Sequence, residues 1–307
     1  MNDSIFADRL HDAIADKGSP ICAGIDPMFD LLPDAVAGPR DKRNANDTGA
    51  VISAFYQFVS GVLEVLAPIV PIVKFQSAYF EQYQQEGVEA YYSLIHEARE
   101  RGLLVIGDIK RGDIGSTSTA YAAGHLVDPP NADENEQASP DAITINPMLG
   151  MDAIEPFVQQ AERENKGLFV LVRTSNPGSA DFQDVLLQSG RTWSEHVADV
   201  LHRRIVAGPI GQSGYSSIGA VVGATQTHTM TSLRQRLPNS IFLLPGYGTQ
   251  GATAEMTRAA FDAAGRGAIV SASRSILYPK TASTDWKSAV RTAAEQMHAD
   301  LSAMRKA

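Results

Sequence analysis

The chain has 307 residues, 44% of them hydrophobic and 20% charged, with a formal charge of −9 at pH 7. This is enough for a substantial core, and barrels of roughly 200–250 residues commonly fold as one domain. With 35 acidic against 26 basic residues and no Lys/Arg block, a nucleic-acid partner is disfavoured. A few well-placed cations could still hold a phosphate group.

The sequence shows no pattern of secretion or membrane insertion. Its one cysteine, Cys22, excludes an internal disulfide and fits a reducing compartment. Residues 1–10 lack the apolar core of a signal peptide. The most apolar stretch, 62–73, contains Glu64 and two prolines and is not expected to cross a membrane. We therefore expect a soluble, cytoplasmic protein.

Short runs rich in β-branched residues recur along the chain, each followed by turn residues. Most are continuously apolar, which is typical of strands buried on both faces. The runs cover residues 21–26, 72–76, 103–110, 142–146, 168–175, 218–225, 241–246 and 268–274.

The segments between these runs have helical spacing, most clearly at 47–67, at 151–165 and from Trp286 to Leu301. Eight strands alternating with helices predict a parallel sheet that closes on itself. We expect an α/β fold, a single (β/α)8 TIM barrel over residues 1–307, with an open doubly wound sheet as the alternative. The acidic, polar segment 125–141 is predicted to be a solvated surface insertion.

Polar residues stand at the C-terminal end of almost every predicted strand. In a barrel these ends converge on one mouth, where active sites are built. The pattern therefore indicates an enzyme. The residues are Asp26, Lys74, Asp108, Lys110, Asn146, Thr174, Ser175, Thr225 and Arg274.

The segment 107–117 carries the candidate catalytic charges. Asp108 and Lys110 are two residues apart on a strand and should point to the same side, with Asp113 on the following loop. Lys74 should project toward the same place. Such groups are costly to bury unless they balance each other. They form either a catalytic charge cluster or a structural ion-pair network, and their position at strand ends favours catalysis.

A glycine-rich turn at 243–252 contains Gly246, Gly248 and Gly251. The pattern G-x-G-x-x-G can indicate a dinucleotide fold, but here it follows the seventh strand instead of opening the fold. A phosphate site fits better, because the loops after strands seven and eight of a barrel commonly bind phosphate. Arg274, at the end of the eighth run, would supply the cation.

These motifs together resemble those of the orotidine 5′-phosphate decarboxylase family. The string Asp108-x-Lys110-x-x-Asp113-Ile114-x-x-Thr117 is similar to the family signature. The resemblance extends over about residues 20–280, in the same order, and is greatest to the longer bacterial branch. The other matching segments are GIDP at Asp26, VKFQ at Lys74, TSNPG at 174–178, PGYGTQG at 245–251 and SRS at Arg274.

The resemblance implies roles at the reacting carbon. Lys110 would protonate C6 of the pyrimidine as CO2 leaves, and Asp108 would lie against the substrate carboxylate. Lys74 and Asp113 would complete an alternating charge array. The partner subunit of a homodimer would supply Asp113, Ile114 and Thr117.

The resemblance also implies the remaining contacts with orotidine 5′-monophosphate. Asp26 and Lys74 would bind the ribose hydroxyls, Ser175 the pyrimidine amide, and Gln250 and Arg274 the phosphate. The product would be uridine 5′-monophosphate, in de novo pyrimidine biosynthesis.

No metal or cofactor is expected, because the seven histidines form neither an H-x-H nor an HExxH pattern. The family shares DxKxxD with magnesium-dependent sugar-phosphate decarboxylases or aldolases on the same barrel, which are the main alternative. Such an enzyme would need a further acid near the second or third strand, where Glu81 is the nearest candidate. A barrel that binds phosphate ligands without catalysis, and a nicotinamide enzyme, are weaker alternatives.

Overall fold

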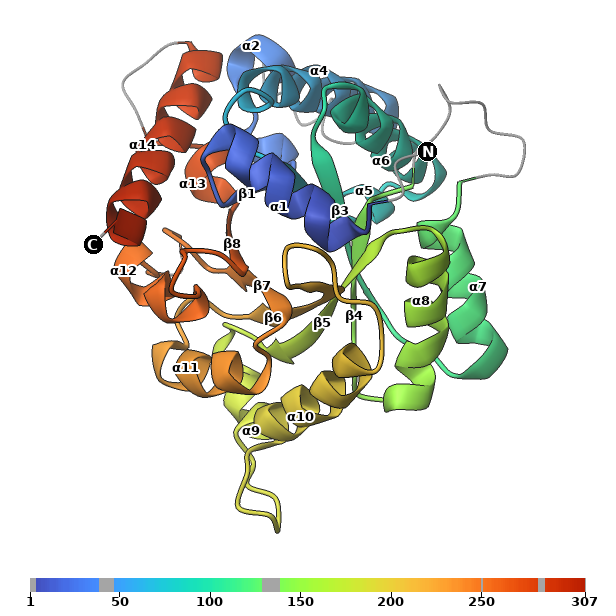
Figure 1. The fold of residues 1–307 in the computed structure, drawn as a ribbon. Coiled ribbons are helices and arrows are strands. Elements are labelled where there is room, and N and C mark those ends of the chain that lie inside the picture. Colours follow the sequence, from blue (N-terminus) through green and yellow to red (C-terminus); the bar gives the residue numbers. More distant parts are fainter. Residues whose placement is uncertain (1–3, 39–46, 129–138, 250, 281–284, 307) are drawn as a thin grey trace.

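The computed structural model describes residues 4–38, 47–128, 139–249, 251–280 and 285–306. Eight parallel strands form a closed barrel in the order of the sequence, with β1 paired to β8 (Figure 1). The strands are β1 (Ile21–Ile25), β2 (Ile72–Gln76), β3 (Leu104–Arg111), β4 (Ala142–Ile145), β5 (Gly167–Arg173), β6 (Ser216–Val222), β7 (Ser240–Pro245) and β8 (Ala268–Ala272).

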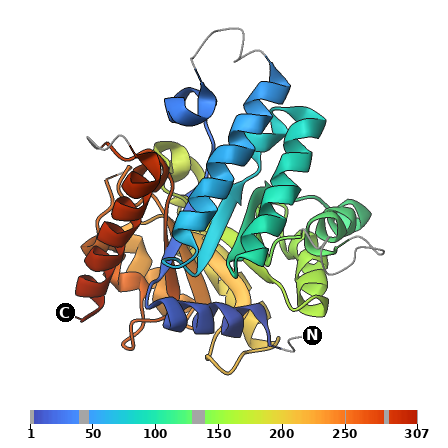
Figure 2. The same ribbon diagram turned by 90° about the horizontal axis from the view of Figure 1, so that it is seen from above.

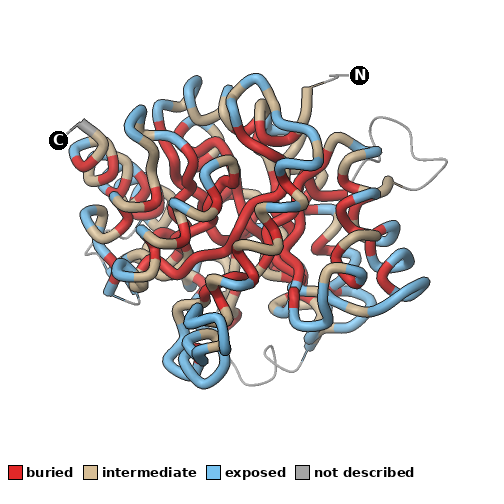
Figure 3. Tube along the Cα trace, turned by 60° about the horizontal axis from the view of Figure 1, so that its bottom comes forward, coloured by how far each residue is buried: buried red, intermediate tan, exposed pale blue. Residues whose placement is uncertain are grey.

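All eight predicted runs form strands, and the predicted TIM barrel is confirmed. Residues of β1, β4 and β8 are buried along their whole length. Figure 3 shows the buried residues concentrated along the barrel strands and the inner sides of the surrounding helices. Burial on both faces explains why these runs are continuously apolar and do not alternate.

Helices surround the barrel (Figures 1 and 2). The longer ones are α1 (Phe6–Lys17), α4 (Thr48–Leu66), α6 (Gln84–Glu100), α7 (Gly115–Leu126), α8 (Met151–Arg163), α10 (Trp193–Val206), α11 (Thr227–Arg236) and α14 (Trp286–Lys306). The shorter ones are η1 (Phe29–Leu31), α2 (Asp34–Ala37), α5 (Ala78–Glu81), η2 (Pro177–Ser179), α9 (Ala180–Gln183), α12 (Ala254–Thr257), η3 (Arg258–Ala260) and α13 (Arg274–Leu277).

Helix α4 is the most apolar of the outer layer. It begins where the side chain of Asp47 accepts a hydrogen bond from Ala50 N at 3.2 Å. By length and composition alone it could cross a membrane, but 61% of its most apolar window is buried. Its apolar residues, among them Phe55 and Val62, pack into the main core, so its composition reflects its place between the barrel and helices α6 and α14.

The N-terminal helix α1 was not predicted, and it lies across one end of the barrel (Figure 1). Its residues Phe6 and Leu10 share a hydrophobic cluster with inward-facing strand residues such as Phe169. The rings of Phe6 and Phe169 meet edge to face at 6.1 Å. A Cβ on Gly167 would lie 2.2 Å from Phe6, so glycine permits this close contact. Helix α1 therefore covers the amino-terminal ends of the strands.

The segment predicted as a solvated insertion, 125–141, is partly structural. Residues 129–138 lie outside the described part of the chain. Ser139 and Asp141, however, are buried, which corrects the prediction at that end. Asp141 accepts hydrogen bonds from Val105 N at 2.9 Å and from Arg9 at 2.9 Å, so it ties the start of β4 to β3 and α1.

Candidate active site

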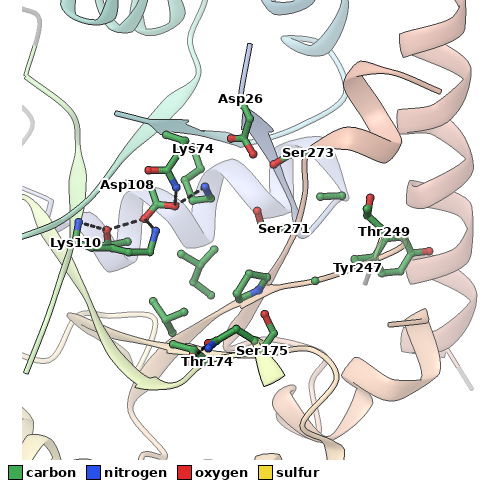
Figure 4. A pocket seen from close by; sticks show the side chains of 18 of the residues that line it. Asp26, Lys74, Asp108, Lys110, Thr174, Ser175, Tyr247, Thr249, Ser271 and Ser273 are labelled. Atoms are coloured by element: carbon green, nitrogen blue, oxygen red, sulfur yellow. Dashed lines mark hydrogen bonds and ion pairs between the residues drawn. The ribbon is translucent and has the colours of Figure 1, made fainter. Parts of the chain in front are cut away.

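A cavity of about 420 Å³ opens at the carboxyl ends of the strands (Figure 4). In Figure 4, Lys74, Asp108 and Lys110 gather on one side, Thr174 and Ser175 lie opposite, and Tyr247 and Thr249 border a third side. Eight of the residues predicted at the mouth line this cavity, and they lie in or just after strands β1, β2, β3, β5, β7 and β8. They are Asp26, Lys74, Asp108, Lys110, Thr174, Ser175, Gly246 and Arg274.

The carboxylate of Asp108 is the centre of the charged side. Its Oδ2 accepts hydrogen bonds from Lys74 Nζ at 2.6 Å and from Gln76 Nε2 at 3.0 Å. Its Oδ1 accepts hydrogen bonds from Lys110 Nζ at 2.5 Å and from Thr144 Oγ1 at 2.8 Å. Asp108 is thus held between two ammonium groups by four donors.

Burial and neighbouring charges shift the pKa values of Asp108 and Lys74 in opposite directions. Burial alone would raise the pKa of Asp108, but Lys74 and Lys110 outweigh it and hold the pKa well below its usual range. Burial alone would lower the pKa of Lys74, but Asp108 and Asp26 outweigh it and raise the pKa. Asp108 and Lys74 are therefore both charged at neutral pH.

Lys110 reaches the cluster through an irregular backbone. Its φ is 48°, in the left-handed region, and the register between β3 and β4 shifts between Gly107 and Arg111. The side chain still meets Asp108, as predicted, but a bulge directs it there, not regular strand alternation. It is 45% exposed, so the ammonium is anchored at Asp108 and open to the cavity.

Asp26 follows β1 and presents an unused acceptor. Its Oδ1 is buried and has no hydrogen-bond partner among the described residues. The backbone nearby is fixed by Tyr278, whose hydroxyl accepts a hydrogen bond from Met28 N at 2.8 Å and donates one to Asp26 O at 3.3 Å. A buried free acceptor at a cavity wall suits a ligand hydroxyl.

The wall opposite the charged cluster is the loop after β5. Its position depends on Arg173, which is 4% exposed and pairs with Asp184 at 2.8 Å. Gln183 accepts a hydrogen bond from Thr174 N at 2.8 Å. This network holds Thr174 and Ser175 at the edge of the cavity.

The glycine-rich turn after β7 folds back on itself. Gly246, Gly248 and Gly251 have φ values of 110°, 72° and 85°, which favour glycine. A Cβ on Gly248 would lie 3.1 Å from Ser275 Oγ, so the turn packs against the segment that begins with Arg274. Gly248 does not line the cavity. The predicted phosphate residue Gln250 lies outside the described residues.

Besides the glycines Gly248 and Gly251, four predicted residues do not line the cavity of their own chain. Asp113 lies just before α7, where its Oδ1 accepts a hydrogen bond from the adjacent Ile114 N at 2.8 Å, and Thr117 is exposed on that helix. Asn146 is exposed and accepts a hydrogen bond from Met148 N at 3.0 Å. Thr225 is half-buried beyond the end of β6.

The cavity also contains residues that the sequence reasoning missed. Gln76 is two residues after Lys74 and faces the same side, so strand alternation could have identified it. Ser271 and Ser273 flank the end of β8 with the same spacing. Thr144 is the one polar residue inside the β4 run, and Thr249 belongs to the glycine-rich turn.

The acid that a magnesium-dependent enzyme would require is engaged elsewhere. Glu81, on α5, forms an ion pair of 2.7 Å with Arg111, and neither residue lines the cavity. Across the described ranges, no group of three or more His, Cys, Asp or Glu side chains is arranged to hold a metal ion.

The fold and site define a TIM-barrel enzyme with a Lys–Asp–Lys cluster at its mouth. The model of the "Orotidine 5′-phosphate decarboxylase / HUMPS family" matches residues 52–289, and the chain belongs to this family. An orotidine 5′-phosphate decarboxylase from Rhodopirellula baltica is 40% identical over 304 residues, covering 96% of this chain and 98% of the relative. One from Caldicellulosiruptor bescii is 38% identical, with 89% of each chain covered. The structure of Leishmania donovani OMP decarboxylase is 28% identical, with a TM-score of 0.74 over 99% of this chain and all of that one (100%).

Proposed function

We propose that this chain is a carboxy-lyase that converts orotidine 5′-monophosphate to uridine 5′-monophosphate and CO2 in de novo pyrimidine biosynthesis. The observation that carries the proposal is the cluster in which Asp108 lies 2.6 Å from Lys74 Nζ and 2.5 Å from Lys110 Nζ at the cavity wall. The relatives that share this chain's family and length bear the name of that activity.

The cluster suits the chemistry. When the bond between C6 and the carboxylate breaks, its electron pair stays on C6, and the ring offers no electron sink. A fixed ammonium group stabilises that charge without reorganising in the reaction. Lys110 then gives a proton to C6, which forms the new C–H bond. Lys110 fits this role because it is anchored by Asp108 and still exposed to the cavity.

The other walls supply places for the rest of the nucleotide. The unused carboxylate oxygen of Asp26, beside the Lys74 ammonium, would accept a hydrogen bond from a ribose hydroxyl. Ser175, on the opposite wall, would bind the pyrimidine amide. Arg274 and the turn containing Gly246 and Gly248, together with Gln250, would bind the phosphate. Phosphate binding far from C6 can drive loop closure and so lower the barrier.

We further propose that the active enzyme is a cytoplasmic homodimer that shares its sites. Asp113 and Thr117 lie outside the cavity of their own chain and are free to serve a second one. Next to them, Ile114 is 59% exposed, and Met148 and Leu149 are 61% and 52% exposed on the loop before α8. Helices α7 and α8 are neighbours (Figures 1 and 2), so these apolar groups flank one surface, as at a subunit interface.

The proposal requires no metal or cofactor. The test is the change in absorbance of orotidine 5′-monophosphate when the purified protein is added after prolonged treatment with EDTA, with the product identified as uridine 5′-monophosphate. We expect full activity without added metal. Activity that is lost on chelation and restored by magnesium would instead favour the sugar-phosphate decarboxylases or aldolases. Lys110→Ala is the matched control and should reduce turnover by more than about 10²-fold.

A further inference from the structure

Thr144 lies within β4 and is 1% exposed, and its hydroxyl contacts two groups of the neighbouring strand β3. Oγ1 donates a hydrogen bond to Asp108 Oδ1 at 2.8 Å and accepts one from Lys110 N at 3.0 Å. A hydroxyl has one hydrogen to donate and two lone pairs. Its hydrogen and one lone pair are thus already used on Asp108 and Lys110.

The contact with Lys110 N falls at the irregular part of the sheet. The pairs Gly107–Ile143 and Arg111–Ile145 are in register, so residues 108–110 of β3 lie opposite Thr144 alone. Because the strands are out of step in this bulge, the ladder does not supply a carbonyl acceptor for every backbone amide. The Thr144 hydroxyl takes the place of that carbonyl for Lys110, whose φ of 48° is unfavourable for a residue with a side chain.

The contact with Asp108 settles the orientation of the carboxylate. Oδ2 is held by Lys74 and Gln76 from β2, on one side. On the other side, Oδ1 is held by Thr144 and by Lys110, whose side chain is 45% exposed. Without the hydroxyl, the half-exposed ammonium of Lys110 is the one donor left on Oδ1 among the described residues.

We propose that Thr144 is a positioning residue for the decarboxylation. Its hydroxyl fixes the rotamer of Asp108 and the left-handed backbone of Lys110 together, so that the proton-donating ammonium is aimed into the cavity before substrate binds. This inference rests on the proposed function. A Thr that merely fills space in a strand would do so equally well without its hydroxyl.

Three variants separate these roles. Thr144→Val keeps the β-branched shape and removes the hydroxyl, whereas Thr144→Ser keeps the hydroxyl and removes the methyl group. Ser240→Ala is the matched control, because Ser240 is also buried and its Oγ donates a hydrogen bond of 2.9 Å to Ile218 O, between β7 and β6, away from the cavity. Thr144→Ala repeats the hydroxyl deletion with a smaller side chain, in case Thr144→Val does not fold.

The measurements are kcat and KM for orotidine 5′-monophosphate, and hydrogen exchange of the Lys110 amide in the substrate-free protein. We expect Thr144→Val to lower kcat by about 10–100-fold, the typical effect of losing a hydrogen bond to a charged group, with KM within about threefold. Its Lys110 amide should exchange at least about tenfold faster. Thr144→Ser and Ser240→Ala should stay close to wild type in both measurements.

Wild-type kcat in Thr144→Val, an equal loss in Thr144→Ser, or a loss confined to KM would each overturn the inference. If the wild-type protein itself does not decarboxylate orotidine 5′-monophosphate, the proposed function fails. The amide exchange then still decides the role of Thr144: unchanged protection of Lys110 in Thr144→Val would show that the hydroxyl does not hold this backbone.

Discussion

Lys74 Nζ lies 2.6 Å from Asp108 Oδ2 inside the barrel, and each side chain is only 7% exposed. Removing one partner of a buried ion pair leaves an uncompensated charge, which typically costs about 3–5 kcal/mol. The two partners are not equivalent here, because Lys110 also lies 2.5 Å from Asp108. Loss of Asp108 removes the carboxylate that both ammonium groups pair with. Loss of Lys74 still leaves Asp108 paired with the ammonium of Lys110.

We therefore expect Asp108→Asn to lower the free energy of unfolding by about 3 kcal/mol or more, and Lys74→Met to lower it by less. Urea denaturation at neutral pH measures both. Asp113→Asn, at a partly exposed position outside the cavity, is the control and should change stability by less than about 0.5 kcal/mol. A larger loss for Lys74→Met would mean that Lys110 does not compensate Asp108.

Arg274→Ala should separate phosphate binding from the rest of recognition. Arg274 lines the cavity beside the turn that contains Gly246. Because Arg274→Ala removes a charged hydrogen-bond donor, kcat/KM for orotidine 5′-monophosphate should fall by at least about tenfold. The value of kcat/KM for the phosphate-free nucleoside should change little. The comparison of kcat/KM for the two substrates checks this, and equal losses would remove Arg274 from the phosphate site.

A mixture of Lys110→Ala and Asp113→Ala should recover activity if the sites are shared. Each variant alone should be nearly inactive. In a two-fold dimer formed at random, about half the molecules are hybrids, and each hybrid has one site with both changes and one with neither. About one quarter of wild-type sites should therefore return after co-refolding. Hybrids that form without recovery would assign Asp113 to the site of its own chain.

Lys166 should make stability depend on pH in the alkaline range. It is 7% exposed and lies 3.9 Å from Asp128. Burial lowers the pKa of Lys166 to about 8, against the opposing effect of Asp128. The unfolded chain, with a lysine pKa of about 10.4, binds more protons between these values, so stability should rise as pH increases from about 8 to about 10.4. Urea denaturation across this range should show the rise in wild type and its absence in Lys166→Met; parallel curves for the two would contradict it.

Phe6→Ala should weaken the fold and leave the chemistry intact. Phe6 is 1% exposed and packs on Phe169 at the end of the barrel that α1 covers. Truncation of a buried Phe typically costs about 3–5 kcal/mol. Thermal unfolding should show the loss, while kcat at low temperature should remain near wild type. If kcat of the folded variant fell as well, packing of α1 at one end of the barrel would affect the active site at the other.

Much of this molecule follows from local sequence features. The eight strands could be located because their residues are buried on both faces, and burial on both faces produces a continuously apolar run. The mouth residues Lys74, Asp108 and Arg274 could be identified because the end of a strand in a parallel barrel determines where its side chain lies. The apolar pattern of a strand and the place of a polar residue at its end can both be read from the sequence alone.

Other features depend on contacts between distant segments, and only the tertiary structure decided them. The hydroxyl of Thr144 meets Asp108 because β3 bulges against β4, and no local pattern specifies that register. Helix α1 has ordinary helical spacing, yet its burial on Phe169 arises from packing across the barrel end. Asp113 lies close in sequence to Lys110 but outside the cavity, because β3 ends at Arg111 and the chain then turns toward α7, which begins at Gly115. Register, bulges and packing join residues far apart in the chain, and their energies are set only when the barrel closes.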